Sequence, residues 1–327
     1  MLLTKAGYWA RRSILEIVLL VLCIVLAFNA DGFGTKDNLL NVLRNVSMQG
    51  IIAFGMTMVI ISGEIDLSVG SAVAFAGCLT AVITKILLAA GMPGPAAVGI
   101  AIISSLAVGF VIGCLTGYIR MKFNVPTFIT TLALMTAMRG IAFLITNGFP
   151  VSAFPEWYNF LGGGYVFGIP FPAIIFIIVF IIVSVLMNYT TFGRAIYAVG
   201  GNVEAARLSG INVKKIKILV MGIVAVFAAM SGVMQSAEIM SGTATTATGW
   251  ELEIIAAVII GGTSLMGGLG KVRGTLVGVI FLGVLVNGMT LMNISEYWQF
   301  VVRGALILSA VLINRASRTK AQRSLAG

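Results

Sequence analysis

The sequence contains no histidine, and charged residues make up only 10% of its 327 positions. The missing histidine removes the commonest metal ligand and the commonest proton shuttle at neutral pH. Soluble domains carry about 25% charged residues, so this chain lacks the polar surface that a water-soluble protein of its length requires. A soluble enzyme or a soluble binding module is therefore excluded.

Cysteine is also scarce, at three residues. Cys23, Cys78 and Cys114 all lie inside apolar segments, where a cysteine behaves as a small packing residue. We expect neither a disulfide nor a metal site from them. The sequence also contains no nucleophile beside a base and no pair of catalytic acids within its apolar segments, so we predict no covalent chemistry in this chain.

Apolar residues dominate what remains, at 59% of the chain, with a mean hydropathy of +1.07. These values indicate a polytopic membrane protein, and no stretch is long and polar enough to form a separate soluble domain. Residues 1–327 are therefore predicted to form a single transmembrane domain. The net charge of +10 does not indicate nucleic-acid binding, because the basic residues flank apolar runs and mark the cytoplasmic ends of helices.

Ten apolar segments approach the ~20 residues that a helix needs to cross a bilayer. They are 14–30, 46–63, 68–89, 95–119, 125–146, 170–188, 216–236, 251–266, 273–292 and 297–314. We predict an all-α polytopic membrane protein with about ten transmembrane helices. Basic residues before the first segment resemble a signal sequence, but Glu16 and the lack of a small-residue cleavage motif favour a retained helix.

The basic residues set the orientation of the chain. With an even number of spans and a cytoplasmic N-terminus, both termini are cytoplasmic, and most Lys and Arg lie inside as the positive-inside rule requires. Those placed inside are Lys5, Arg11, Arg12, Arg120, Lys122, Arg194, Arg207, Lys214, Lys215, Lys217, Lys271, Arg273, Arg315, Arg318, Lys320 and Arg323. Lys36, Arg44 and Lys85 fall at or near the outer face.

The polar stretch "GGNVEAARLSGINVKKIKI" (200–218) lies in a predicted cytoplasmic loop, 189–217. Asn202 is a suitable N-cap, the residues from Glu204 to Leu208 favour a short helix, and Gly210 ends it. This segment is either a helix on which a partner docks or a solvated loop whose basic residues anchor the topology.

A second polar stretch, "SGEIDLSVG", separates two apolar runs and contains Glu64, Asp66 and Ser68. In one interpretation it is a helix break in which the Asp66 carboxylate caps the next helix. In the other, it forms a gate or a solute contact, because irregular backbone at membrane depth occurs only inside protein or along a cavity. The two roles are compatible. The stretch "IIGGTSLMGGLG" (259–270) is a similar glycine-rich break.

Arg139 and Arg303 are the basic residues predicted to lie inside the membrane, each about 10 Å below the outer boundary. An arginine in lipid is costly, so each must face a partner or an aqueous cavity. They form structural pairs with Glu251, Glu253 or backbone carbonyls, or else they line an outward-facing vestibule where planar guanidinium groups bind a polar solute.

The chain lacks a loop that could bind ATP. The nearest candidate, "GGLGKVRGT" (267–275), fails the phosphate-binding pattern because Leu265 stands where glycine is required and Val272 where serine or threonine is required. If transport is driven by ATP, the energy must come from another subunit.

Three stretches resemble the signatures of the ribose-type sugar permeases of ABC importers. They are "ISGEIDLSVGSAVAFAG" (61–77), "YAVGGNVEAARLSGINV" (197–213) and "WELEIIAAVIIGGTSLMGGLG" (250–270). They occur in the right order, and the similarity extends over essentially the whole chain. Two residues depart from the usual pattern: Glu64 where the family usually has glycine, and Glu253 where it usually has aspartate.

The resemblance implies a type II ABC importer-like fold and a membrane-spanning permease subunit that imports a monosaccharide, ribose or a related sugar. Glu204, Ala205 and Ala206, followed by Gly210 and Ile211, resemble the motif of the coupling helix that contacts the ATPase. The coupling residues implied are Asn202, Glu204, Ala205, Ala206, Arg207, Gly210 and Ile211. The candidates for the translocation path or gate are Glu64, Asp66, Ser68, Arg139, Arg303, Glu251 and Glu253.

The same resemblance implies the partners: a second copy of the chain, a cytoplasmic ATPase that carries ATP and Mg²⁺, and an extracytoplasmic sugar-binding protein. It places the protein in the bacterial cytoplasmic membrane, with no cofactor of its own. The alternative is an ion-coupled secondary transporter of a small polar solute, which would use Glu64 and Asp66 as ion carriers. The absence of histidine and the scarcity of intramembrane acids argue against it.

Overall fold

The computed structural model describes residues 14–309 and residue 312, and the fold is built almost entirely from helices. Its long helices are α2 (Ile14–Asn29), α3 (Lys36–Ile61), α4 (Val69–Ala89), α5 (Gly94–Phe123), α6 (Thr127–Ile145), α8 (Phe171–Tyr189), α11 (Val213–Glu238) and α13 (Val272–Leu291). Shorter elements are η1 (Glu156–Asn159), α7 (Phe160–Gly163), β1 (Tyr165–Val166), β2 (Ile169–Pro170), α9 (Thr191–Gly201), α10 (Val203–Leu208) and α12 (Trp250–Ile260). Residues 296–309 are also helical.

Within the described residues, seven helices are long and apolar enough to cross a membrane: α3, α4, α5, α6, α8, α11 and α13. Helix α2 is a shorter apolar helix of 16 residues. These elements confirm an all-α polytopic membrane protein. The basic residues before residue 14 and after residue 312, which are predicted to be cytoplasmic, lie outside the described part of the chain.

The predicted segment 251–266 does not form a full span. Helix α12 has only 11 residues and ends at Ile260, where Gly261 and Gly262 follow. At 1.5 Å per residue it is about 16 Å long, roughly half of the ~30 Å hydrocarbon core. The expectation of a continuous eighth helix is therefore wrong, because the glycine-rich sequence after Ile260 gives up helical hydrogen bonds for a turn with a positive φ at Gly262.

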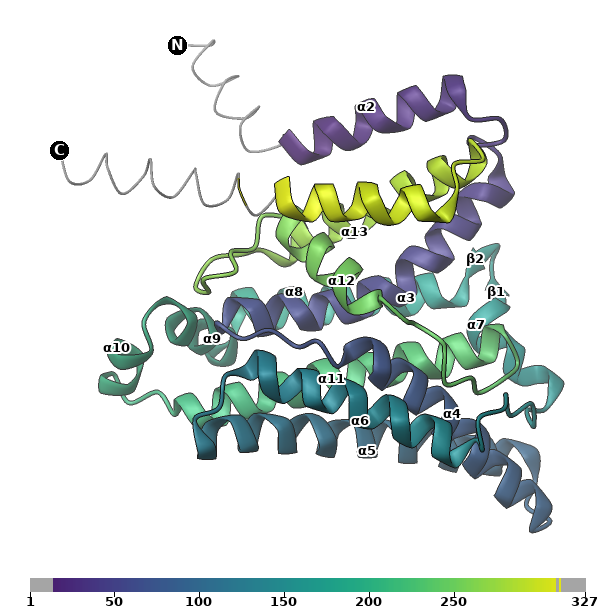
Figure 1. The fold of residues 1–327 in the computed structure, drawn as a ribbon, viewed down its shortest axis with the longest axis horizontal. Helices are drawn as coiled ribbons and strands as arrows, with labels where there is room; N and C mark the ends of the chain where they lie inside the picture. The colour runs from purple at the N-terminus through teal and green to yellow at the C-terminus, as the bar shows by residue number, and fades with distance from the viewer. Residues whose placement is uncertain (1–13, 310–311, 313–327) are drawn as a thin grey trace.

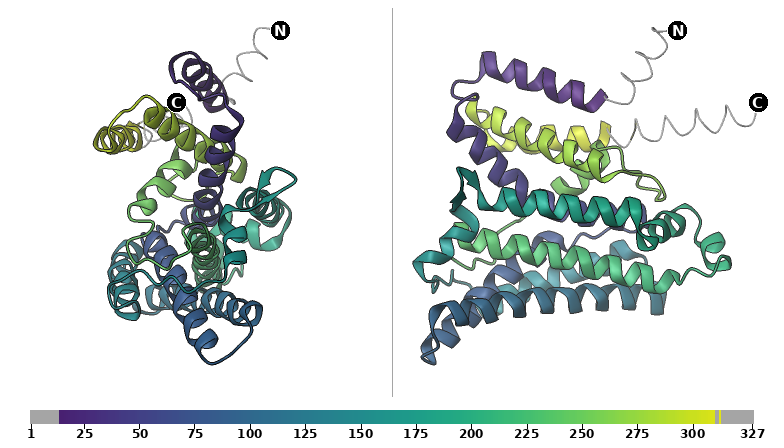
Figure 2. Two further views of the ribbon diagram at one scale, coloured as in Figure 1. Left: turned by 90° about the vertical axis from the view of Figure 1, so that its right-hand side faces the viewer. Right: turned by 180° about the vertical axis from the view of Figure 1, so that it is seen from behind.

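The long helices lie with their axes roughly parallel, and α3 runs through the middle of the molecule (Figure 1). From Val46 to Ile61, α3 is buried almost without interruption. Helices α9 and α10 lie at one end of the molecule, and α7 with the β1–β2 hairpin lies at the opposite end, as Figure 1 and the right-hand view in Figure 2 show. These two extensions of the chain thus lie on opposite sides of the helical layer.

Close helix packing depends on small residues. Gly109, Gly113 and Gly117 follow one face of α5 at intervals of four residues and contact α11. A Cβ at Gly113 would collide with the Met221 carbonyl and the Ala225 side chain. Small residues of this kind let backbones approach within a membrane, where the hydrophobic effect does not drive association.

The segment between α6 and α8 forms a cap over the end of the helices opposite α10. Tyr158 of η1 is fully buried, and its hydroxyl lies 3.0 Å from the Val233 carbonyl and 2.9 Å from Ser236 Oγ of α11. Burial raises the pKa of the Tyr158 hydroxyl, so it remains protonated and can donate to its partner. This contact fixes the segment between α6 and α8 onto the helix bundle.

Candidate functional site: an intramembrane cavity, a buried charge cluster and a projecting helix

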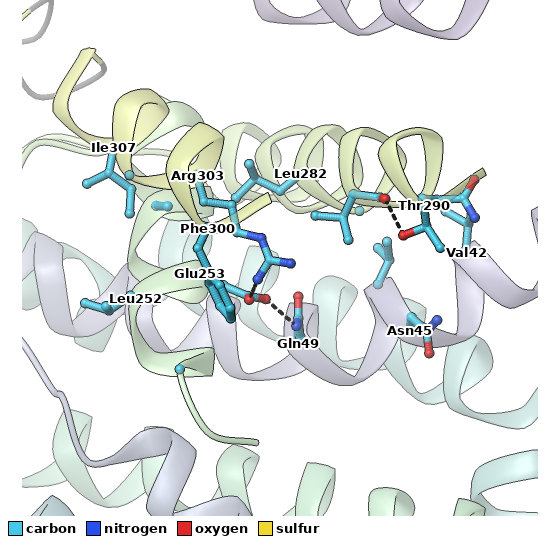
Figure 3. A pocket seen from close by; sticks show the side chains of 17 residues that line it. Val42, Asn45, Gln49, Leu252, Glu253, Leu282, Thr290, Phe300, Arg303 and Ile307 are labelled. Atoms are coloured by element: carbon cyan, nitrogen blue, oxygen red, sulfur yellow. Dashed lines mark hydrogen bonds and ion pairs between the residues drawn. The ribbon is translucent and has the colours of Figure 1, made fainter. Parts of the chain in front are cut away.

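A cavity of about 470 Å³ lies between α3, α12, α13 and the helical residues 296–309 (Figure 3). Most of its wall is apolar. Polar groups enter it from every side: Asn45 and Gln49 from α3, Glu253 from α12, Asn287 and Thr290 from α13, and Arg303 from the last helix. A largely apolar cavity with a few convergent polar groups is the usual form of a small-molecule site.

The polar centre of this cavity is a connected network. Arg303 forms an ion pair with Glu253 and hydrogen-bonds Gln299 Oε1 at 3.3 Å. Gln49 Nε2 donates to the other carboxylate oxygen of Glu253 at 2.8 Å. Figure 3 shows Glu253 of α12 between Gln49 and Arg303, so side chains from two other helices hold its carboxylate. The structure thus gives Arg303 both predicted environments, an ion pair with Glu253 and the wall of a cavity.

Arg139 does not share this cavity. Its Nη1 donates to the carbonyls of Ala244 and Thr246 at 2.5 and 2.7 Å, both in the loop before α12. Of the two environments predicted for Arg139, the structure shows pairing with backbone carbonyls, although Arg139 and Arg303 were predicted at the same depth. Depth along a helix does not specify the direction of a side chain, and Arg139 is oriented toward part-buried loop carbonyls.

Glu251, two residues before Glu253 on α12, packs tightly on α4. A Cβ at Gly70 would overlap its carboxylate, so glycine is required at that position. Glu251 Oε2 is buried and has no hydrogen-bond partner among the described residues. The two predicted acids of α12 thus differ: Glu253 is paired inside the cavity and Glu251 lies against the start of α4.

The helix break predicted at "SGEIDLSVG" is present. Helix α3 ends at Ile61, Gly63 has a φ of +81°, and α4 begins at Val69. Asp66 Oδ1 accepts from the backbone N–H and the hydroxyl of Ser68 at 2.8 and 2.6 Å. Ser68, not Asp66, occupies the N-cap position, so the predicted capping role of Asp66 is displaced by two residues. The carboxylate orders the entry to α4 instead.

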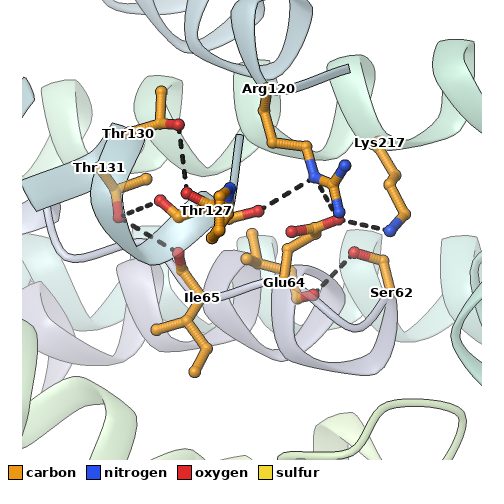
Figure 4. Close-up of polar contacts among 10 residues, drawn as sticks. Ser62, Glu64, Ile65, Arg120, Thr127, Thr130, Thr131 and Lys217 are labelled. Carbon is orange, nitrogen blue, oxygen red and sulfur yellow. Dashed lines mark hydrogen bonds and ion pairs between the residues drawn. The ribbon is translucent and has the colours of Figure 1, made fainter. Parts of the chain in front are cut away.

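Glu64 lies at the centre of a buried charge cluster (Figure 4). It forms an ion pair with Lys217 of α11, and its Oε1 lies 2.9 Å from Nε of Arg120 at the end of α5. The side chains of Glu64 and Lys217 are only 4% and 7% exposed, so neither charge is solvated and each depends on the other. Arg120 also donates to Thr127 of α6 at 3.2 Å.

The two glycine-rich breaks that resemble each other in sequence lie together in space. The Gly268 N–H donates to the Ile61 carbonyl at 2.8 Å. A Cβ at Gly200 of α9 would overlap that same carbonyl oxygen. The end of α3, the end of α9 and the segment after α12 therefore meet at one junction, beside the Glu64 cluster.

Helix α10 forms as the sequence predicts. Asn202 Oδ1 accepts from the Ala205 N–H at 3.0 Å, and Gly210 follows the helix with a φ of +82°. Glu204 and Arg207 pair with each other on the exposed surface. Ala206 is buried, and the Ile211 N–H donates to its carbonyl at 3.0 Å, which closes the helix against the start of α11.

Sequence reasoning missed three members of these sites: Gln49, Arg120 and Lys217. Arg120 and Lys217 were assigned only to the cytoplasmic side, as residues that set the topology. A signal was present at Lys217, because it is flanked by Ile216 and Ile218 at the start of an apolar helix, where a solvated lysine is unexpected. Gln49 has no comparable signal, since its partner Glu253 lies 204 residues away in sequence.

Comparison with known proteins agrees with this architecture. The family described as "Branched-chain amino acid transport system / permease component" matches residues 38–311. The matched region includes the cavity, the charge cluster and α10. No solved structure matches this chain.

The chain is similar to characterised permeases over nearly its whole length. It is 42% identical to the ribose import permease protein RbsC of Escherichia coli K12 over 315 residues, which cover 95% of each chain. It is 40% identical to RbsC of Bacillus subtilis over 299 residues, covering 91% of this chain and 90% of the relative. It is 36% identical to the L-arabinose transport system permease protein AraH of E. coli over 317 residues, covering 97% and 94%.

Proposed function

This chain belongs to the family of permease components of branched-chain amino acid transport systems, and from this membership we propose that it is the membrane-spanning subunit of an ATP-driven importer for ribose or a related monosaccharide. The observation that carries the substrate class is full-length similarity to permeases named for ribose and for L-arabinose. The protein is a multi-pass protein of the bacterial cytoplasmic membrane.

The projecting helix α10 is the proposed contact with the ATPase. It is the segment that resembles the coupling motif, and it extends beyond the helical layer at one end of the molecule (Figure 1). This end carries Arg120, Lys122, Lys214 and Lys215, so the positive-inside rule makes it cytoplasmic. The arrangement supports a type II importer-like subunit with about ten membrane segments and both termini inside.

The cavity at Glu253 and Arg303 is the proposed outer part of the sugar path. Amide, carboxylate and guanidinium groups can exchange hydrogen bonds with the hydroxyls of a neutral sugar. Phe300 contributes an aromatic surface to the same wall. We propose that two copies of the chain pair to complete the path, with an extracytoplasmic binding protein delivering the sugar and ATP and Mg²⁺ bound by the ATPase partner.

On this proposal the chain carries out no covalent chemistry. ATP binding closes the ATPase dimer, α10 moves with it, and the permease pair alternates between outward and inward openings. Glu64, Asp66 and Ser68 lie where α3, α4, α9 and α11 meet, so this break is the proposed inner gate. The ion-coupled alternative is disfavoured, because Glu64, one of its two candidate ion carriers, is ion-paired with Arg120 and Lys217.

Isolation of the protein with the products of neighbouring genes tests the class of transporter. A permease subunit co-purifies with an ATPase, and the chain alone transports no sugar in vesicles with or without a proton gradient. An ion-coupled transporter would be active alone and would lose transport when the gradient is collapsed. The matched control is the complex in which the ATPase carries an inactivating substitution in its own phosphate-binding loop.

A further inference from the structure

A second cavity, of about 430 Å³, lies where the end of α8, helix α9 and the start of α13 meet. Three cations line it: Arg194 from α9, and Lys271 and Arg273 from the start of α13. Asn188 and Tyr197 complete its polar wall. The cavity is separate from the sugar path and from α10, so the transport mechanism does not account for its charge.

The cations of this cavity lack matching anions. Arg194 and Lys271 form no ion pair with any described residue, and Arg273 lies 3.9 Å from Glu16 of α2 with most of its side chain exposed. Residues 1–13 and 310–327, outside the described part, contain no Asp or Glu. Three positive charges therefore surround one cavity with a single carboxylate in reach.

The shape of the cavity is fixed by contacts that do not involve its cations. The Tyr197 hydroxyl donates to the Gly270 carbonyl at 2.9 Å, which holds α9 against the residue before Lys271. Burial raises the pKa of the Tyr197 hydroxyl, so it remains a donor. Lys271 is the N-cap of the 20-residue α13 and has no side-chain oxygen, so the positive end of that helix adds to the field.

An apolar stripe leads from this cavity into the membrane layer. Ile177, Ile181, Ser184 and Asn188 follow one face of α8 at helical spacing, and the last two line the cavity. Ile177 and Ile181 are about half exposed, at 50% and 54%. A cationic cavity at a helix end, continuous with an exposed isoleucine face, matches a molecule with an anionic head and a hydrocarbon tail.

We propose that this cavity binds the headgroup of an anionic phospholipid of the cytoplasmic leaflet, with an acyl chain along the Ile177–Ile181 face of α8. Basic pockets between membrane helices on the cytoplasmic side recognise such headgroups, and the phosphodiester charge complements Arg194, Lys271 and Arg273. The assignment of the leaflet depends on the orientation proposed above, whereas the lipid contact itself does not depend on sugar transport.

The apolar stripe favours a lipid over the two other anionic occupants. A free phosphate ion would use the cations and leave the isoleucines unused. A soluble ATPase would contact Arg194 and Lys271 from the aqueous side and would also leave the membrane-facing isoleucines unused. Only an amphiphile contacts the cations with its anionic group and the isoleucines with its hydrocarbon chain.

The test is lipid binding to the purified permease, without the ATPase or a sugar, in detergent supplemented with a defined phospholipid. Native mass spectrometry counts bound phosphatidylglycerol, with phosphatidylcholine as the zwitterionic control. The variant Arg194→Gln/Lys271→Gln is compared with Lys214→Gln/Lys215→Gln, which removes the same charge from the exposed first turn of α11. Each cation is expected to contribute about fivefold to lipid affinity, so the first variant weakens phosphatidylglycerol binding by about 30-fold. The control variant weakens it by less than about threefold.

Three outcomes overturn the proposal. They are equal binding of phosphatidylglycerol and phosphatidylcholine, equal losses in the two variants, and full displacement of phosphatidylglycerol by millimolar inorganic phosphate. A separate co-purification of the same variant with the ATPase tests the other occupant: if Arg194→Gln/Lys271→Gln keeps its lipid but loses the ATPase, the surface is a subunit interface and the lipid assignment is also overturned. Ile181→Asn provides a second check, because it reduces lipid retention while leaving all three cations in place.

Discussion

The buried Glu64–Lys217 pair shows what a single charged residue requires when it is buried inside a membrane protein. Taking two charges out of water costs several kcal/mol per ion, and only their mutual attraction and further hydrogen bonds recover it. Glu64 meets both conditions through Lys217 and Arg120. Lys217 and Arg120 thus provide the counter-charges that a buried carboxylate at this position requires.

We expect Glu64→Leu to destabilise the protein by about 3–5 kcal/mol, because it leaves the buried Lys217 ammonium without a partner. The double variant Glu64→Leu/Lys217→Leu recovers most of that loss, since it removes both charges. Thermal unfolding followed by tryptophan fluorescence in detergent measures the difference. Equal melting temperatures for the single and double variants would show that the pair makes no energetic contribution.

Asp66 is predicted to act first on structure. Asp66→Asn retains an oxygen that accepts from the Ser68 N–H, so it preserves much of the transport activity. Asp66→Leu removes that acceptor, so it lowers the free energy of unfolding by about 1 kcal/mol or more and reduces the amount of folded protein. Uptake normalised to protein level distinguishes the cases. Similar loss of uptake in both variants at normal protein level would assign Asp66 to the gate instead.

Arg303 is predicted to be reachable from the outside and Arg139 to be shielded. In a background that lacks Cys23, Cys78 and Cys114, a cysteine at 303 faces the 470 Å³ cavity and reacts with a water-soluble thiol reagent. A cysteine at 139, beneath the Ala244–Thr246 carbonyls, reacts at least about tenfold more slowly. Labelling rates measured by mass shift decide this. Faster labelling at 139 than at 303 would reverse the assignment of the vestibule.

At the scale of elements, the sequence predicts helices well and predicts their interruptions less well. The break after Ile61 follows from "SGEIDLSVG", and α10 follows from Asn202 and Gly210. The short α12 was missed because "WELEIIAAVII" is apolar and helical over its whole length, and composition alone does not show that Gly261 ends it. The Gly268–Ile61 hydrogen bond anchors the segment that follows this turn, and that contact is not visible in a linear sequence.

The coupling role of α10 is testable at Gly210. Its φ of +82° cannot be adopted by proline, whose ring fixes φ near −65°, so Gly210→Pro distorts the exit from α10. We expect membrane insertion to persist while the ATPase detaches or its hydrolysis is uncoupled from uptake. Gly201→Ala, a change with open space around the new methyl group, is the control and remains coupled. Intact assembly and uptake in Gly210→Pro would rule out docking through α10.

At the scale of the whole molecule, composition and charge predict the class of protein and resemblance predicts its function. The scarcity of charged residues, the apolar runs and the basic loops indicate a polytopic membrane protein before any motif is considered. Cavities are different, because they arise from side chains of distant segments: Gln49, Glu253 and Arg303 come from three helices. Their polarity made Glu253 and Arg303 recognisable as candidates, but their contact required the fold.

The central claim is that ATP hydrolysis by a partner drives a monosaccharide through this chain. The most direct measurement is uptake of radiolabelled ribose into proteoliposomes that contain the permease and its ATPase, with the binding protein on the outside and ATP sealed inside. The account predicts accumulation that requires ATP and the binding protein, persists when the proton gradient is collapsed, and stops in Gly210→Pro. Ribose uptake that continues without ATP and follows the proton gradient would contradict it.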